Sequence, residues 1–275
     1  MLAAALAPAG AAARPTDELL ALVNSYRTAP ATCQGRMRAA VPALSARRAL
    51  SGIALSPGSI LIAALDKAGY DAEVADAVHV AGPADAQAAF EALREAYCAT
   101  LSSKRYTDAG ARHQGNEWTL VLARAMPDPA AVLPAWQDAG RNVLAATNAA
   151  RSQARQCGGE WMDAAPPLEW NAMLASAALA HSEDMADKRY FSHTGKDGRE
   201  VGHRASDAGY RWRTVGENIA RGQLSVNEVV AGWLDSPGHC HNVMNPRFTE
   251  MGAAYSVRGG RRPAAYWTQV FALPR

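Results

Sequence analysis

The sequence predicts an α+β fold made of two tandem domains that are copies of one another. The first observation behind this prediction is an internal repeat, because anchor residues of the first half recur in the second half in the same order. The second is the pattern of the second half, where stretches with helical periodicity precede and separate two stretches that alternate like antiparallel strands. Helices arranged around antiparallel strands indicate a layered α+β domain.

The repeat is preserved at offsets that grow only by insertion, which is what a tandem duplication leaves. The anchors at an offset of 124 residues are Asn24, Arg27 and Cys33, which recur as Asn148, Arg151 and Cys157. The anchors at an offset of 142 residues are Cys98, Tyr106 and Thr107, which recur as Cys240, Phe248 and Thr249. Near the end of each copy, Trp118-Thr119 recurs as Trp267-Thr268.

These anchors divide the chain of 275 residues, a length that suits two domains of ordinary size. The first copy is predicted to span residues 16–126 and the second residues 137–275. Three prolines between them place a linker at residues 127–136. Residues 1–15 are predicted to be a secretory signal or a flexible N-terminus, because a small apolar run ends before Arg14-Pro15 but lacks a basic leading segment.

The elements of the second copy follow from periodicity and capping residues. Residues 143–152 are typical of a helix, and a second helix over residues 171–189 places its apolar side chains on one stripe, in which His181 is expected to be a hydrogen-bonded core histidine. Ser225-x-x-Glu228 is a capping box that opens a third helix. Residues 251–257 and 266–272 alternate like two strands joined by a turn.

Charge and apolar content exclude two classes of function. The net charge is +2 and the isoelectric point is about 8.4, which is too mild to predict binding to nucleic acid. No run reaches the roughly 18 apolar residues that a transmembrane helix needs, so we expect no transmembrane segment.

The four cysteines allow three pairings, of which the repeat favours Cys33–Cys98 and Cys157–Cys240. Each copy would then carry its own disulfide, and such bonds persist in an oxidising compartment, so we expect a secreted or periplasmic protein. Free buried thiols are the alternative. A zinc site of cysteine and histidine ligands is less favoured because no Cys-x-x-Cys spacing exists.

One polar set is present only in the second copy. Where the second copy has Glu217 the first has Ala77, and where the second has His239 the first has Tyr97. His193 lies in a segment in which the first copy is shorter. A residue needed merely to build the fold should be needed twice, so this set is predicted to serve function.

The second copy resembles the CAP superfamily (cysteine-rich secretory proteins, antigen 5 and pathogenesis-related proteins), and specifically its bacterial SCP-domain branch. The matching stretches are Leu168-Glu169-Trp170-Asn171, residues 180–186, Tyr190-Phe191-Ser192-His193, residues 216–220, residues 233–239 and residues 245–252. The first copy resembles the family only through the internal repeat, so it is interpreted as a degenerate CAP-like domain without the cleft residues.

The resemblance implies an α–β–α sandwich in each domain, with a small antiparallel sheet between helical layers. It also implies a surface cleft of two histidines and two acidic residues. His193 and His239 match the two histidines, and Glu217 matches the acid of the Gly-Glu-Asn motif. Ser236 stands where many eukaryotic relatives carry the second acid, and the adjacent Asp235 is the alternative carboxylate.

The chemistry of this set leaves three functions open. His193, His239 and Glu217 together can hold a divalent metal ion, with zinc the first candidate, or Glu217 can instead orient one imidazole. The leading expectation is a secreted module that binds a ligand in the cleft, with or without the metal. A metal-assisted hydrolase of peptide or cell-envelope substrates is the second, although no serine lies in a nucleophile elbow. A lipid or sterol carrier, binding a lipid or an envelope component, is the third.

Overall fold

The computed structural model describes residues 14–54 and 60–275 and divides the chain into two compact units, with the boundary between Met126 and Pro127. The predicted signal-like stretch lies almost wholly outside the described residues, and the first helix begins at Pro15. Each unit is an α+β arrangement with its own four-stranded sheet, so the predicted mixed fold class is confirmed.

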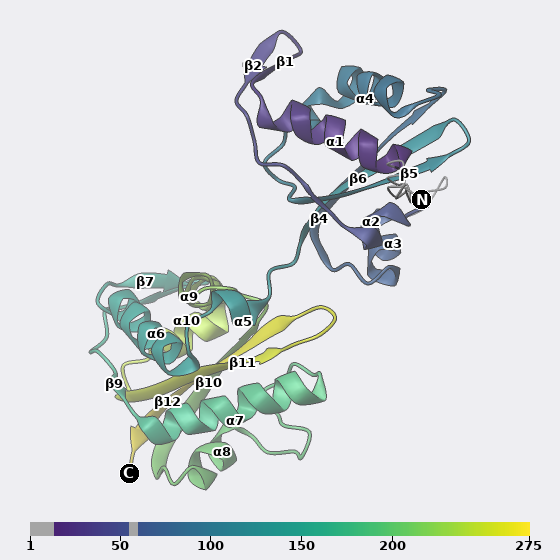
Figure 1. The fold of residues 1–275 in the computed structure, drawn as a ribbon. Coiled ribbons are helices and arrows are strands. Elements are labelled where there is room, and N and C mark those ends of the chain that lie inside the picture. The colour runs from purple at the N-terminus through teal and green to yellow at the C-terminus, as the bar shows by residue number, and fades with distance from the viewer. Residues whose placement is uncertain (1–13, 55–59) are drawn as a thin grey trace, which may run out of the picture. The chain divides into compact units, whose positions relative to one another are not determined.

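The N-terminal unit places two helices on each face of its sheet (Figure 1). Its strands follow the order β3-β5-β6-β4, in which β3 runs parallel to β5 and the other pairs are antiparallel. Helices α1 and α4 cover one face, and α2 and α3 the other. The elements are α1 (Pro15–Thr28), β1 (Ala31–Cys33), β2 (Arg36–Arg38), β3 (Ser45–Ala46), α2 (Arg48–Ser51), α3 (Leu61–Lys67), β4 (Ala72–Ala81), α4 (Ala86–Leu101), β5 (Asp108–Gln114) and β6 (Glu117–Ala125).

The C-terminal unit also has a four-stranded sheet with helices on both faces. Its sheet has the order β9-β11-β12-β10, again with one parallel pair at the short edge strand. Helices α7 and α8 cover one face, and α6, α9 and α10 the other (Figure 1). The elements are α5 (Pro129–Val132), α6 (Trp136–Arg151), β7 (Arg155–Cys157), β8 (Glu160–Met162), β9 (Glu169–Trp170), α7 (Ala172–Lys188), α8 (Val201–Asp207), β10 (Trp212–Arg221), α9 (Val226–Asp235), α10 (Pro237–Met244), β11 (Glu250–Arg258) and β12 (Ala264–Pro274).

Capping side chains set the helix starts that the sequence indicated. The Asn171 side chain accepts hydrogen bonds from the backbone of Met173 and Leu174 at the start of α7. Ser225 accepts from Glu228 N at the start of α9, while the Glu228 carboxylate accepts from Leu224 N, one residue before the position of a standard capping box. The predicted helix over 171–189 and both predicted strands are therefore confirmed to within a few residues.

The segment before the second domain differs from the expectation of a simple linker. Residues 127–136 include the short helix α5 and the first residue of α6. Leu133 is buried in the core of the C-terminal unit, and the Tyr255 hydroxyl donates a 2.5 Å hydrogen bond to the carbonyl of Pro134. Pro129 occupies the first turn of α5, where its missing N–H costs nothing.

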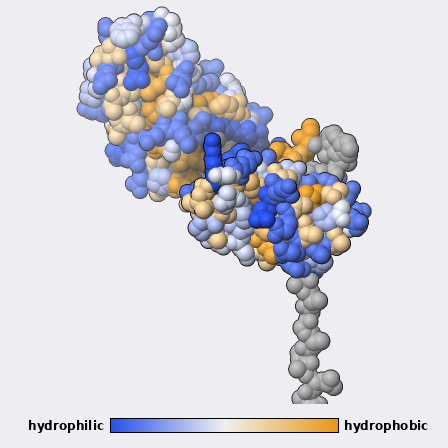
Figure 2. Space-filling model, turned by 90° about the horizontal axis from the view of Figure 1, so that it is seen from above, coloured by the Kyte–Doolittle hydropathy of each residue, from blue (hydrophilic) through white to orange (hydrophobic). Residues whose placement is uncertain are grey.

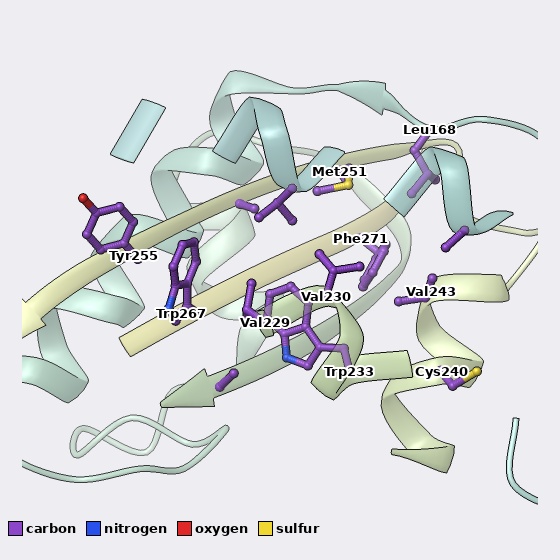
Figure 3. Packing of buried hydrophobic residues seen from close by; sticks show 14 of the residues in the cluster. Leu168, Val229, Val230, Trp233, Cys240, Val243, Met251, Tyr255, Trp267 and Phe271 are labelled. Atoms are coloured by element: carbon purple, nitrogen blue, oxygen red, sulfur yellow. The ribbon is translucent and has the colours of Figure 1, made fainter. Parts of the chain in front are cut away.

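The main core of the C-terminal unit lies between the sheet and the layer of α6, α9 and α10. Trp233 from α9 packs toward Phe271 and Trp267 of β12, and Cys240 lies at the α10 edge of the same cluster (Figure 3). Burying aromatic side chains of this size contributes several kcal/mol. This core fixes α10, which carries His239, against the sheet.

Glycines allow one helix in each unit to press directly on the sheet. A Cβ atom at Gly252 of β11 would lie 2.0 Å from the Ala175 nitrogen of α7. In the N-terminal unit a Cβ at Gly110 of β5 would lie 2.4 Å from the Ser51 nitrogen of α2. Both positions therefore require glycine for close packing rather than for backbone freedom.

Each unit also buries one arginine without a carboxylate partner. The Arg151 side chain is fully buried, and burial lowers its pKa to about 10. Its guanidinium donates to the backbone carbonyl oxygens of Pro166, Val243, Asn245 and Phe248. Arg27 donates in the same way to the carbonyls of Pro42, Leu101, Ser103 and Tyr106. These arginines join segments that are distant in sequence.

The disulfides are Cys33–Cys98 and Cys157–Cys240, and they account for all four cysteines of the chain. The predicted pairing is confirmed. The first joins β1 to α4 and the second joins β7 to α10. In the C-terminal unit the bond therefore fixes the residue directly after His239.

The surface visible in Figure 2 is mostly hydrophilic, with smaller hydrophobic patches between the polar residues. Within the described residues, none of the helices combines the length and the apolar character that a membrane span requires.

Candidate functional site

Three of the predicted cleft residues come together from three different elements. His193 lies in the loop between α7 and α8, Glu217 in β10, and His239 in α10. The Nδ1 atom of His193 lies 2.9 Å from Oε1 of Glu217, and the ring centroids of His193 and His239 are 6.4 Å apart. The His193 side chain is 55% exposed, whereas that of Glu217 is only 2% exposed. The site is thus a buried carboxylate beneath two imidazoles.

Arg204 completes this arrangement from α8. Its Nη2 atom donates to Oε2 of Glu217 at 2.6 Å and to the backbone carbonyl of His193 at 3.0 Å. Its Nη1 atom donates to the carbonyl of Arg199 at 2.8 Å, and the side chain is 10% exposed. Arg204 therefore neutralises the buried carboxylate and holds the backbone of the histidine that this carboxylate contacts.

Arg204 was not among the residues predicted from the sequence, although the predicted repeat contains a signal for it. The offset of 140 residues that pairs Glu217 with Ala77 also pairs Arg204 with Ala64. Both members of the ion pair are thus alanine in the N-terminal unit. An arginine in a polar segment reads as an ordinary solvated side chain unless its counterpart is examined.

The hydrogen bond to Glu217 decides which nitrogen of His193 is available. A carboxylate accepts at Nδ1, so Nδ1 carries the proton and Nε2 keeps its lone pair. Burial lowers the pKa of His239, and the neighbouring His193 lowers it further by charge repulsion. His239 therefore stays neutral to lower pH than an ordinary histidine.

His181 supports the loop that carries His193. Its ring is buried, and Nε2 donates to the carbonyl of Ser192 at 2.9 Å. Burial lowers the pKa of His181, which keeps the ring neutral although it lies 3.9 Å from Glu217. The prediction of a hydrogen-bonded core histidine is confirmed.

A buried amide network ties the backbone of His239 to the strand that carries Glu217. The Asn218 amide donates to the carbonyl of His239 and to the side chain of Gln269, each at 3.2 Å. Gln269 in turn donates to the Thr147 hydroxyl at 2.8 Å. Asn242 donates to the Glu217 carbonyl at 3.1 Å and to the Asn218 side chain at 3.0 Å.

The N-terminal unit has apolar residues at the positions that correspond to Asn218 and Gln269. Asn218 pairs with Gln269 across β10 and β12, and the matching pair across β4 and β6 is Val78 with Leu120. The position of Thr147 is held there by Val23 at the offset of 124 residues. Apolar residues thus occupy these positions in a sheet of the same strand order, so this strand pairing does not by itself require a polar network.

The remaining predicted residues lie nearby but outside these contacts. Asp235 is the exposed last residue of α9, and Ser236 lies between α9 and α10. Over residues 14–54 and 60–275, no recorded interaction joins either one to the three central residues, so their role stays a prediction. His241 uses Nδ1 on the Pro237 carbonyl and Nε2 on Glu160, which raises its pKa and leaves no nitrogen for a ligand.

The donors at the centre fit a two-histidine metal site better than a site with three protein ligands. Both Glu217 oxygens already accept hydrogen bonds, one from His193 and one from Arg204. Over the described residues, the three central side chains included, no group of three or more His, Cys, Asp or Glu side chains is arranged to hold a metal ion. Glu217 thus fits the role of a carboxylate that orients a ligating histidine.

Comparison with known proteins gives a family for the C-terminal unit. Residues 144–271 match the CAP family, described as the cysteine-rich secretory protein family. The protein YkwD of Bacillus subtilis is 39% identical over 105 residues, and the membrane protein YlbC of the same species is 34% identical over 104 residues. Each match covers 38% of this chain, and they cover 39% of YkwD and 28% of YlbC, so the chain spans less than half the length of these relatives.

Among solved structures, an extracellular protein of Bacillus anthracis with an SCP domain has 24% sequence identity and a TM-score of 0.45. The superposition covers 58% of this chain and 53% of that one. Residues 144–271, which make up most of the C-terminal domain, thus match the CAP family of cysteine-rich secretory proteins.

Proposed function

We propose that this chain is a secreted protein whose C-terminal CAP domain binds a ligand at His193, Glu217 and His239, with a divalent metal ion held by the two imidazoles. The secreted location is supported by the two disulfides, since such bonds persist in oxidising compartments. The proposed role is ligand binding rather than covalent catalysis, because the contacts of the three central residues, within the described part of the chain, include no serine or cysteine nucleophile.

The observation that carries this proposal is the hydrogen bond between Glu217 and Nδ1 of His193. It orients a half-exposed ring so that Nε2 is free, beside a second imidazole that burial keeps neutral. Neutral imidazole suits zinc, and a carboxylate behind the ligating histidine strengthens it as a ligand. A zinc ion bound there would leave coordination positions open to water and to oxygen or nitrogen atoms of a ligand.

The N-terminal unit is proposed to be a degenerate copy of the same domain, without a cleft. The same strand order, the matched disulfide and the matched buried arginine support this part of the proposal. Asn24 and Asn148 also make the same pair of hydrogen bonds, to the backbone of Leu44 and Leu168 respectively. Residues 16–126 and 137–275 are thus the two copies proposed.

Titration of zinc into the metal-stripped full chain tests the site. We expect one ion to bind, and the His193→Ala/His239→Ala variant to lose at least tenfold in affinity. His79→Ala is the matched control, because His79 is an exposed histidine of the N-terminal unit. Imidazole must be neutral to bind metal, so the affinity should hold at neutral pH and fall in acid. Because burial lowers the pKa of His239, this histidine should keep its share of the affinity to lower pH than an ordinary histidine would. Equal affinity of the double variant, or no binding by the wild type, contradicts the proposal.

The amide network is tested by giving the C-terminal unit the apolar side chains of its counterpart. The Thr147→Val/Asn218→Val/Gln269→Leu variant removes both partners of two buried hydrogen bonds, and it leaves the His239 carbonyl and one Asn242 amide proton without theirs. Its stability should therefore fall by no more than about 3 kcal/mol. His239 loses its hydrogen bond to Asn218, so zinc affinity should fall at least tenfold. Urea unfolding and calorimetry measure the two effects. A large loss of stability with unchanged affinity would instead make the network a part of the fold.

A further inference from the structure

A pocket of the C-terminal domain lies between α7, α8 and the loop that joins them, next to the His193 site. Its volume is about 400 Å³, which is within the range of small-molecule pockets. His181 and Arg204, which support His193 and Glu217, also line this pocket. The pocket therefore adjoins the proposed metal site but contains neither His193 nor His239.

The pocket exists because small side chains occupy the face of α7 that lies opposite α8. Ala177 and Ala180 of α7 and Ala208, directly after α8, form an apolar wall. Ala180 is exposed in the middle of a helix, where a longer side chain would be tolerated and would fill the space. An open pocket with an apolar wall is available to the hydrocarbon part of a ligand.

The pocket is not needed to build the fold. Leu50 corresponds to Leu174, and Ala64 corresponds to Arg204. Between these matched positions the first copy has 13 residues, whereas the second has 29 residues, 175–203. Most of the pocket wall, from Ser176 to Arg199, lies in this longer stretch. The segment that the N-terminal unit lacks thus supplies both His193 and the pocket, which indicates a role in binding rather than in stability.

Acidic side chains from three separate segments surround the apolar wall. They are Asp184 of α7, Asp197 of the following loop and Asp207 of α8. The two cationic side chains of the lining are Arg199 and Arg204. The charge of Arg204 is neutralised by the buried Glu217. Arg199 pairs with Asp207 and lies 3.8 Å from Asp197, and Lys188 pairs with Asp184 from the next turn of α7.

The three carboxylates are thus matched by two available cations, which leaves a net negative charge around an apolar wall. We propose that this pocket binds a small organic cation, with its hydrocarbon part against the alanines and its ammonium group among the carboxylates. The attraction is charge-assisted and the wall contributes by burial of apolar surface. This site goes beyond the proposed metal site and does not depend on it.

Three probes of equal length test the proposal by ligand-observed NMR on the metal-stripped full chain. Hexylammonium should bind with a dissociation constant of about 1 mM or tighter. Hexanoate should bind at least tenfold more weakly, because it is repelled by the carboxylates, and 1-hexanol should fall between them. Binding of hexanoate or 1-hexanol as tight as that of hexylammonium overturns the cation preference.

A pair of matched variants tests the location. Ala180→Leu fills the pocket and should abolish hexylammonium binding, while Ala172→Leu adds the same side chain at the exposed first residue of α7 and should leave it unchanged. Unaltered binding by Ala180→Leu overturns the assignment. The His193→Ala/His239→Ala variant should bind hexylammonium as the wild type does, so a failure of the metal site and a failure of this pocket give different results.

Discussion

Replacing Arg204 by alanine is expected to destabilise the C-terminal domain by about 3–5 kcal/mol, because it leaves a buried carboxylate without its charged partner. Glu217 is 2% exposed and receives a 2.6 Å hydrogen bond from Arg204. Water that enters from the pocket beside Arg204 can hydrogen-bond to Glu217 but carries no charge, so the cost of burying the carboxylate is only partly offset. The backbone carbonyl of His193 loses its donor in the same step.

The double variant Arg204→Ala/Glu217→Gln separates the charge from the shape of the site. Glutamine keeps the size of Glu217 and an acceptor for His193 but carries no charge, so we expect it to recover at least half of the lost stability. Urea unfolding of the full chain, followed by tryptophan fluorescence, measures both. Six of the seven tryptophans lie in the C-terminal unit, so the signal reports chiefly on that domain. A double variant as unstable as Arg204→Ala would refute the role of the buried charge.

Replacing Arg151 by methionine is expected to cost the C-terminal domain more than about 4 kcal/mol. Methionine fills much of the space but cannot donate to the four carbonyl oxygens that Arg151 satisfies. Each buried carbonyl left without a donor costs about 1–3 kcal/mol. The free energy of unfolding from the same fluorescence measurement is the test.

Arg27→Met is the matched control, since it removes the same donors from the N-terminal unit. It should leave the transition followed by the six C-terminal tryptophans almost unchanged, and Trp118, the one tryptophan of the N-terminal unit, should report the loss there. A loss of less than about 1 kcal/mol in Arg151→Met would show that the carbonyls find other partners.

These experiments distinguish polar residues that stabilise the fold from polar residues that form the site. The sequence partly indicates the same distinction. Arg27 and Arg151 recur in both copies, which indicates the framework, and each is buried among backbone carbonyls. Glu217 and His239 occur in one copy only, which indicates the site. This comparison is informative because the two units have the same sheet order, as two copies of one domain would.

The limits of prediction also have physical causes. Helices α7 and α9 could be predicted from Asn171 and Ser225, because a capping side chain acts within three residues of its own position. The start of α6 at Trp136 could not be predicted, because the nearby prolines favour a linker. The burial of this helix depends on contacts with strands that are distant in sequence. Gln269 was missed for a similar reason, since only cross-strand pairing brings it to Asn218.

The order of the strands has a consequence for folding during synthesis. Among the described strands, β12 is the one hydrogen-bonded neighbour of β10, and it also pairs with β11, although it is the last strand of the domain. The sheet, and the placement of Glu217 and Gln269 within it, cannot form until Ala264–Pro274 leaves the ribosome. The N-terminal sheet closes with β6, long before that point. We therefore expect the N-terminal sheet to close while the C-terminal domain is still being synthesised, so that the two domains fold in that order.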